Sequence, residues 1–286
     1  MPFGAGSATD MTARLFGASL AQQWGQAVVI ENKPGGDSNI AAGAFAVAHD
    51  DHTLMYSAPN PITVNPVIYE KLPYDPVTAL VPISSGSEIH LAIAVPTSLN
   101  VNTLAELVAL ARAQPRKLNW VATPGVTYFM FAGFLKDVGV DMAFVPYRDF
   151  TQAMSDLSEG RIQVTVTSLA VARPLAQTGK VKILAVPNQR RNPLFPDIPT
   201  VAEAGFPQLT FGAFGGFFGW KGMPNDLRER IATDSRAAGA DPTIGSRLAS
   251  AGVAVTTSTP AEFTAAIEDE RAKVAAVAKA LGTPRL

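Results

Sequence analysis

Pro2-Phe3-Gly4-Ala5-Gly6-Ser7-Ala8-Thr9-Asp10 opens the chain as a turn with two glycines that leads directly into a helix. From Met11 to Trp24 apolar residues recur at helical spacing, so one face of this helix is expected to pack on a core. Gly4 and Gly6 lack a Cβ, which lets the backbone bend sharply and approach a ligand closely. Ser7 and Asp10 have the spacing of a capping box, which pairs two N–H groups of the first helical turn. The remaining N–H groups and the helix dipole predict a site for a carboxylate or a phosphate.

Three interpretations of this turn compete. Taken alone, it is most simply a capped helix after a tight turn. The second interpretation is a dinucleotide-binding fingerprint, because Gly4-x-Gly6-x-x-Thr9 precedes an expected strand at 28–30 that is followed by Glu31. The third glycine is missing, however, and only three residues precede the turn, too few for the strand that this fingerprint requires. The third interpretation, a site for a small carboxylate, is the one that the rest of the chain favours.

Composition narrows the class of protein. The 286 residues suit one large domain or two medium ones, and 47% of them are hydrophobic, enough for a sizeable core. The formal net charge is -1 and the charges are dispersed, so no nucleic-acid partner is expected. The chain has no Cys, which excludes thiol chemistry, disulfides and cysteine metal sites. No apolar run reaches the ~20 residues that span a bilayer, and no secretion leader opens the sequence, so we expect a soluble chain, either mature or truncated.

Short β-branched runs alternate with helical stretches along the whole chain. This alternation is typical of sheets whose faces are covered by helices, so the predicted fold class is α/β. The expected strands lie at residues 28–30, 53–57, 91–95, 118–122, 143–147, 162–167, 181–186, 211–220 and 253–256. The expected helices beyond the first lie at 39–48, 103–113, 128–138, from 150 to near 160, 168–177, from 224, 241–251 and 260–281.

Two further loops offer polar groups at places where open α/β sheets bind ligands. The first is Ser57-Ala58-Pro59-Asn60, and a turn that only reverses the chain is an equally good interpretation of it. The second is Thr123-Pro124-Gly125-Val126-Thr127, which follows a strand and leads through Tyr128 into a helix. Because this second loop repeats the opening design, the two helix ends could face one ligand. Ordinary strand-to-helix turns would have the same spacing.

Arg148 follows the expected strand at 143–147 and is the best-placed candidate for pairing with a ligand carboxylate through its planar guanidinium. An exposed Arg148, or one paired with the neighbouring Asp149, is the alternative.

The sequence gives little support to metal or hydrolytic chemistry. Its three histidines are His49, His52 and His90, and the first two lie in a polar helix-to-strand turn, so no metal site is expected. Gly36-Asp37-Ser38 is similar to the nucleophile block of some esterases, but no histidine follows late in the chain. Neither a Gly-x-Ser-x-Gly elbow nor a phosphate-binding loop is present. We therefore expect no cofactor and no enzymatic activity.

Several blocks of the sequence, in order, resemble the Bug-type solute-binding proteins of the tripartite tricarboxylate transporter family. The resemblance spans nearly the whole chain, and its longest block starts at Asp197. The residues that carry it are Pro2-Phe3 with Gly6 and Thr9-Asp10; Glu31-Asn32-Lys33-Pro34-Gly35 with Asn39-Ile40; Leu72-Pro73-Tyr74-Asp75-Pro76; Val145-Pro146-Tyr147; and Asp197-Ile198-Pro199-Thr200-Val201-Ala202-Glu203-Ala204-Gly205.

The resemblance implies a two-lobed periplasmic binding protein of the type II class, with a mostly parallel sheet in each lobe. Residues 1–95 and 221–286 would form the first lobe, and residues 96–220 the second. A small organic carboxylate would be held largely by backbone amides and then delivered to membrane transporter subunits. A periplasmic location and a monomer are expected. The implied ligand-binding residues are Phe3, Gly4, Ala5, Gly6, Ser7, Ala8, Thr9, Asp10, Ser57, Ala58, Asn60, Thr123, Pro124, Gly125, Val126, Thr127, Tyr128, Tyr147, Arg148 and Ser168.

The chain also departs from the family pattern. Ser7 and Asp149 replace usual glycines, and the loop from Thr123 to Phe129 is more apolar than usual. These changes favour a ligand with one carboxylate and an apolar or aromatic body, within the classes of dicarboxylates, acidic amino acids and aromatic carboxylates. The family's first strand, normally before Pro2, and its secretion signal are absent from this sequence. An enzyme on the same scaffold, or a binding module without a transporter, are the alternative functions.

Overall fold

The chain divides into two compact units. The computed structural model describes residues 1–48, 51–147, 149–192 and 195–286. The first unit comprises Met1–Glu88 and Phe214–Leu286, and the second comprises Ile89–Ala213. The chain passes between the units at two strands, β2 (Val81–Ile89) and β8 (Ala213–Gly219). The boundaries expected from the sequence, after residues 95 and 220, fall near the end of the following strand β3 (Leu91–Pro96) and just beyond β8.

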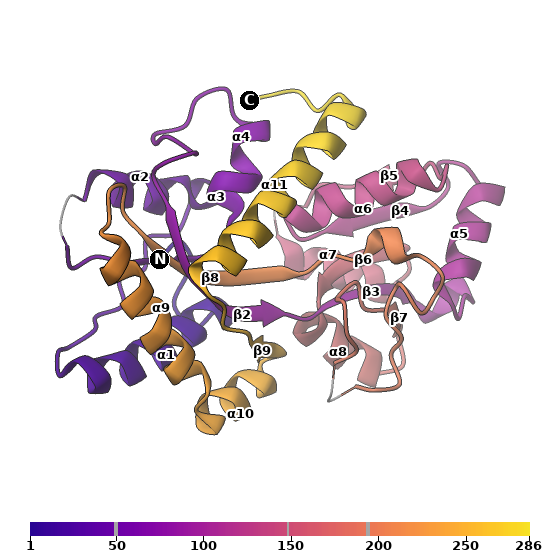
Figure 1. Ribbon diagram of the computed structural model, residues 1–286. Helices are drawn as coiled ribbons and strands as arrows, with labels where there is room; N and C mark the ends of the chain where they lie inside the picture. The colour runs from indigo at the N-terminus through magenta and orange to yellow at the C-terminus, as the bar shows by residue number, and fades with distance from the viewer. Residues whose placement is uncertain (49–50, 148, 193–194) are drawn as a thin grey trace. The chain divides into compact units, whose positions relative to one another are not determined.

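A four-stranded sheet forms the centre of the first unit, in the order β1-β8-β2-β9. β1 runs antiparallel to β8, with Tyr56 opposite Phe217. The helices α1, α9 and α10 contact one another beside this sheet, as Figure 1 shows. The remaining strands are β1 (Met55–Ser57) and β9 (Val253–Val255), and the helices are α1 (Ala8–Trp24), α2 (Asn39–Val47), α3 (Asn60–Thr63), α4 (Asn65–Ile68), α9 (Asn225–Gly239), α10 (Pro242–Ser250) and α11 (Pro260–Leu281).

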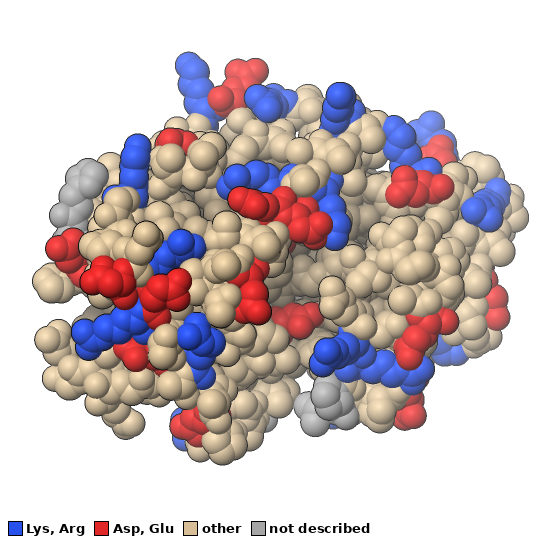
Figure 2. Space-filling view, viewed as in Figure 1, with Lys and Arg blue, Asp and Glu red and all other residues tan. Residues whose placement is uncertain are grey.

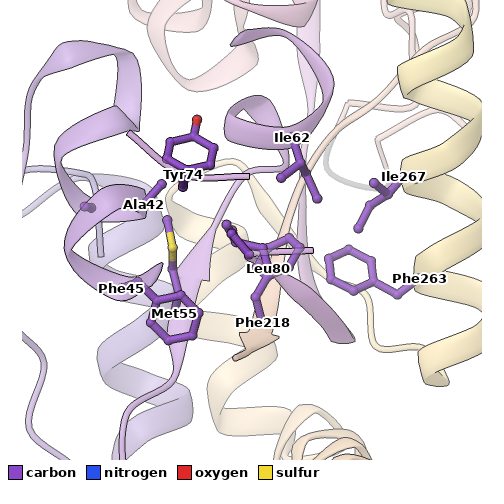
Figure 3. Close-up of a cluster of buried hydrophobic side chains, with 11 residues drawn as sticks. Ala42, Phe45, Met55, Ile62, Tyr74, Leu80, Phe218, Phe263 and Ile267 are labelled. Atoms are coloured by element: carbon purple, nitrogen blue, oxygen red, sulfur yellow. The ribbon is translucent and has the colours of Figure 1, made fainter. Parts of the chain in front are cut away.

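A core of large apolar side chains joins α2, α11 and the sheet of the first unit (Figure 3). Phe263 of α11 lies against Phe218 of β8, with ring centroids 5.3 Å apart. A Cβ on Gly216 would lie only 2.4 Å from the Phe263 ring, so only glycine permits this approach of helix and strand. The glycine-rich, aromatic composition of β8 is therefore explained by packing.

The second unit contains a five-stranded sheet in the order β5-β4-β6-β3-β7. β5, β4 and β6 are parallel, whereas β3 runs antiparallel to both β6 and β7. Only His90 separates β3 from β2, which belongs to the sheet of the first unit. The other elements are β4 (Asn119–Ala122), β5 (Ala143–Phe144), β6 (Val164–Ser168), β7 (Val181–Ala185), α5 (Leu104–Ala113), α6 (Val126–Asp137), α7 (Phe150–Ser158) and α8 (Leu169–Gln177).

The prediction of an α/β fold is confirmed, but individual elements differ from the expectation. Residues 28–30 form no strand, and the side chain of Val29 is 85% exposed. Within the described residues, these positions have no neighbouring strand with which to form hydrogen bonds. The strand expected at 143–147 is limited to Ala143–Phe144, and β2 was not predicted.

Charged side chains are distributed without a large area of one sign on the face shown in Figure 2. This distribution agrees with the net charge of -1. Among the residues that the structure describes, no helix combines the length and the apolar character needed to cross a membrane.

Candidate functional site: the amino-terminal turn and the loops at the sheet edges

The turn before α1 has the geometry that its glycines and Ser7 predict. Gly6 adopts a φ of 83°, a conformation that favours glycine. Ser7 is the N-cap residue of α1, and its hydroxyl accepts a hydrogen bond from the Asp10 N–H at 3.2 Å. Gly4, Ala5 and Gly6 are exposed, and a Cβ on either glycine would have open space around it. A ligand can therefore approach the backbone of this turn.

Asp10 holds the turn together from inside. Its carboxylate accepts hydrogen bonds from the Gly6 N–H at 2.9 Å, from Arg14 Nε at 2.9 Å and from Asn32 Nδ2 at 2.8 Å. The bond from Arg14 is the main reason why the pKa of Asp10 is lowered to about 2, and the bonds from Asn32 and Gly6 add to it. The predicted capping box is thus present in part, because the carboxylate bonds the N–H of Gly6 instead of that of Ser7.

Several N–H groups of this turn remain available. Within the described part of the chain, the N–H groups of Ala5, Ala8 and Thr9 donate no hydrogen bond to another residue. Ala8 and Thr9 are the first two residues of α1, where the helix dipole concentrates partial positive charge. Because Arg14 already neutralises Asp10, the negative charge of Asp10 does not cancel this attraction. The arrangement has the chemistry to bind an anion, and the anion site itself stays a prediction.

The loop with Ser57, Ala58 and Asn60 follows β1 in the same unit. Ser57 is buried, and its hydroxyl donates to the carbonyl of Ala58 at 2.7 Å, so this side chain stabilises the loop itself. Asn60 begins α3 and is half-buried. Burial raises the pKa of the neighbouring Tyr56, and hydrogen bonds with Ser87 and Thr12 lower it in part. Thr12 belongs to the second turn of α1, so the end of β1 lies close to the start of α1.

The candidate loops of the second unit lie along one edge of its sheet. Thr123 directly follows β4, and Ser168 is the last residue of β6. β4 is parallel to both β5 and β6, so all three strands end at the same edge. Tyr147, three residues beyond β5, comes from this edge as well. The structure thus brings together the second-unit residues that the sequence singled out and that it describes.

The Thr123 loop leads into α6 through Gly125, which adopts a φ of 101°. The hydroxyls of Thr123 and Thr127 are hydrogen-bonded to each other at 3.0 Å. The half-buried Tyr128 stacks on Trp120, with ring centroids 5.6 Å apart and an interplanar angle of 13°. Pro124 is exposed, whereas Val126 is buried and packs inside the unit. Thr127 is buried and its hydroxyl also donates to the carbonyl of Thr123, so the loop presents the Thr123 hydroxyl and the half-buried ring of Tyr128.

Two of the predicted second-unit side chains already have partners within the unit. The Tyr147 hydroxyl donates to Asp156 at 2.6 Å; burial and this neighbouring carboxylate raise the pKa of Tyr147 to about 12. Ser168 is the N-cap residue of α8. Arg148, the predicted carboxylate partner, and His49 lie outside the described residues.

Sequence reasoning missed the residues that support the site. Asn32 bridges the Asp10 carboxylate and the carbonyl of Phe3, both at 2.8 Å. In the sequence, the only sign that Asn32 has such a role was its position in the block Glu31-Asn32-Lys33-Pro34-Gly35. Trp120 stacks on Tyr128. Nothing in the sequence distinguished it from other apolar strand residues. In the described residues, no group of three His, Asp or Glu side chains is arranged to hold a metal ion.

Comparison with known proteins identifies the family. Residues 12–283 match the model of the tripartite tricarboxylate transporter family receptor. The chain belongs to this family. Members of this group are solute-binding receptors rather than enzymes, and the two α/β units described above are those of periplasmic binding proteins.

Relatives cover most of the chain. A UPF0065 protein of Bordetella bronchiseptica is 30% identical over 249 residues, which cover 86% of this chain and 73% of that protein. The structure of R. palustris Rpa4515 with adipate has a TM-score of 0.84 and 30% identity, covering 100% of this chain and 96% of that one. The structure of MatC (Rpa3494) from Rhodopseudomonas palustris with bound malate has a TM-score of 0.78 and 27% identity, covering 97% of this chain and 96% of that one.

Proposed function

We propose that this receptor-family chain is a periplasmic solute-binding protein that captures a small organic carboxylate by closure of its two units. It then delivers the ligand to the membrane subunits of a tripartite tricarboxylate transporter. The protein performs no chemical conversion of its ligand.

The free N–H groups of Ala8 and Thr9 at the start of α1 are the single observation that carries this proposal. Hydrogen bonds from backbone N–H groups to a carboxylate are charge-assisted and therefore stronger than those between neutral groups. The exposed glycines beside these groups leave room for the ligand. Solved relatives with adipate and with malate support a carboxylate as the ligand.

The chemistry of the second unit supports a ligand with an apolar or aromatic body behind its carboxylate. The loop at Thr123 combines the half-buried Thr123 hydroxyl with the aromatic ring of Tyr128, which is stacked on Trp120. Dicarboxylates, acidic amino acids and aromatic carboxylates are the classes to test. Because only a ligand that interacts more favourably with the closed form can shift the equilibrium toward it, groups from both units must contact the ligand.

A thermal-shift screen tests the proposal directly. The panel is adipate, malate, citrate, glutamate and benzoate, with the neutral diamide of adipate as the matched control. A carboxylate present at about 100 times its Kd adds about 2.7 kcal/mol to the stability of the native state. We expect one class of carboxylate to raise the melting temperature by several degrees and the diamide to have no effect.

Two outcomes contradict the proposal. One is the absence of any carboxylate-dependent shift across the panel. The other is conversion of a panel compound into a product, followed by NMR, which would favour an enzyme on this scaffold.

A further inference from the structure

A buried tyrosine hydroxyl joins three elements of the first unit. Tyr56, the middle residue of β1, is only 4% exposed. Its Oη lies 2.8 Å from Oγ of Ser87 in β2, and it is also hydrogen-bonded to the hydroxyl of Thr12 in α1. Both partners are buried as well, so these bonds form without competition from solvent. The three hydroxyl groups therefore make one internal network.

Glycines on two strands leave room for the Tyr56 hydroxyl. β8 lies between β1 and β2, so the Tyr56 side chain crosses β8 to reach Ser87. A Cβ on Gly215 of β8 would lie 3.5 Å from Oη of Tyr56, and a Cβ on Gly86 of β2 would lie only 2.9 Å from it. The ring of Phe217 packs edge-to-face on that of Tyr56, with centroids 4.8 Å apart, and fixes its orientation. Glycine at position 86 is thus explained by the space that the hydroxyl occupies.

The direction of each hydrogen bond follows from the single proton that each hydroxyl carries. The Thr12 hydroxyl lies 2.9 Å from the Ala8 carbonyl, which can only accept, so Thr12 donates this bond. Tyr56 must then donate to Thr12, because Thr12 has no second proton to donate. For the same reason Ser87 donates to Tyr56. The network thus runs in one direction, from β2 through β1 to the carbonyl of Ala8 at the start of α1.

The last bond of this network orients one of the two proposed ligand donors. The carbonyl of Ala8 and the N–H of Thr9 belong to the same planar peptide group and point in opposite directions. A bond that holds this carbonyl therefore also orients the Thr9 N–H, which donates to no other residue among those that the structure describes. Burial raises the pKa of Tyr56, so its hydroxyl stays protonated and able to donate at neutral pH.

We infer that Tyr56 is a positioning residue of the carboxylate site: without touching the ligand, it ties the first turn of α1 to β2 and thereby orients the Thr9 N–H. The inference rests on the proposed function, because it assigns a role in the same site. A donor that is already held in its binding orientation loses less conformational entropy when the ligand arrives, which raises affinity. Loss of the Tyr56 hydroxyl should therefore weaken binding.

The test removes the hydroxyl and keeps the ring, in the variant Tyr56→Phe. Tyr69→Phe is the matched control, because Tyr69 belongs to the same unit and its hydroxyl donates to Asp37 at 2.5 Å instead of to α1. Isothermal titration measures the affinity for adipate, malate, citrate, glutamate and benzoate. The amide NMR signal of Thr9 is recorded without any ligand for both variants.

A second pair of variants keeps the test valid if Tyr56→Phe folds poorly. Thr12→Ser retains the hydroxyl, and Thr12→Val removes it. For the panel carboxylate that binds the original chain most tightly, we expect Tyr56→Phe and Thr12→Val to bind about 10-fold more weakly. Tyr69→Phe and Thr12→Ser should bind as the original chain does. The Thr9 amide signal should move in Tyr56→Phe and stay in place in Tyr69→Phe.

Three results would overturn the inference: unchanged affinity of Tyr56→Phe, an equal loss of affinity in both tyrosine variants, or equal binding by Thr12→Val and Thr12→Ser. If the original chain binds no carboxylate of the panel, the proposed function fails instead. The ligand-free Thr9 signal then decides whether Tyr56 orients this turn, and an unmoved signal in Tyr56→Phe would show that it does not.

Discussion

Asp10 stabilises the turn of the proposed carboxylate site from inside. Its carboxylate is only 2% exposed and accepts hydrogen bonds from Gly6, Arg14 and Asn32. These bonds hold Gly6 in its left-handed conformation and leave the N–H groups of Ala8 and Thr9 free. The side chain thereby positions the backbone, and the backbone provides the donors.

Replacing Asp10 with Asn should destabilise the protein at neutral pH and have little effect in acid. The pKa of Asp10 is lowered from 3.8 to about 2, so its contribution is complete above about pH 4 and is lost as the pH falls through about 2. We expect the variant to be less stable by about 1 to 2 kcal/mol at pH 7. This is less than the full pKa shift would give, because Arg14 is half-exposed and solvent screens its interaction with Asp10.

Urea unfolding at pH 7 and pH 2 measures this difference. Asp241→Asn is the control, because Asp241 caps α10 and Asn caps a helix equally well. A loss of stability in Asp10→Asn that is the same at both pH values would contradict the assigned role.

At the same scale, the sequence predicted the turn but not its supports. The turn is recognisable from neighbouring residues: two glycines, a Ser N-cap and the helical spacing of the apolar residues that follow. These residues are close in sequence, and together they determine the geometry of the turn. Asn32 is 22 residues from Asp10, and nothing in the spacing indicates that the two meet. The internal bond between Tyr147 and Asp156 likewise depends on tertiary packing.

Among the elements, α11 and α3 are joined by a buried carboxyl group. Thr63 of α3 donates to Glu270 of α11 at 2.6 Å, and Glu270 is only 7% exposed. Burial raises the pKa of Glu270 from 4.5 to about 7, against a smaller opposite effect of Thr63. This contact is relevant to the candidate site because it holds α3, and α3 begins at Asn60, one of the predicted ligand-binding residues.

Replacing Glu270 with Gln should change the pH dependence of stability. Because the folded-state pKa is raised, the contribution of Glu270 is complete below about pH 4.5 and is lost as the pH rises through about 7. The stability of Glu270→Gln relative to the original chain should therefore increase by about 2 to 3 kcal/mol between pH 5 and pH 8. Urea unfolding at both pH values provides the measurement, with the exposed Glu268→Gln as control. An unchanged difference would show that Glu270 does not titrate in this range.

The sequence predicted best those elements in which apolar residues recur at a regular spacing. The closing helix was expected at 260–281 and is observed as α11 (Pro260–Leu281). Residues 28–30 had the composition of a strand, but strand formation requires a neighbour, and the described part of the chain provides none. β2 was missed because its three serines and Gly86 resemble a loop.

At the scale of the whole molecule, each unit carries loops with the chemistry to contact a ligand. The α/β fold was predicted from the alternation of β-branched runs with helical stretches, and the family from blocks of residues spread along the chain; both are confirmed. The proposed closure depends on small differences in free energy between an open and a closed form, which a sequence does not specify.

Closure should be visible in solution as a decrease in the radius of gyration. Small-angle X-ray scattering with and without the carboxylate that gives the largest thermal shift provides the measurement. The neutral diamide should leave the radius unchanged. An equal radius with and without a bound carboxylate would mean that the ligand is held without closure.

The central claim is that backbone N–H groups at the start of α1 bind the carboxylate, and Ala8→Pro tests it most directly. Proline is well tolerated at the first position of a helix, so this change removes one donor without breaking α1. Asn225→Pro, at the first position of α9, is the matched control. Isothermal titration with the best carboxylate of the panel should show binding about 10 to 100 times weaker for Ala8→Pro and unchanged for Asn225→Pro. Equal affinity of the two variants would contradict the claim.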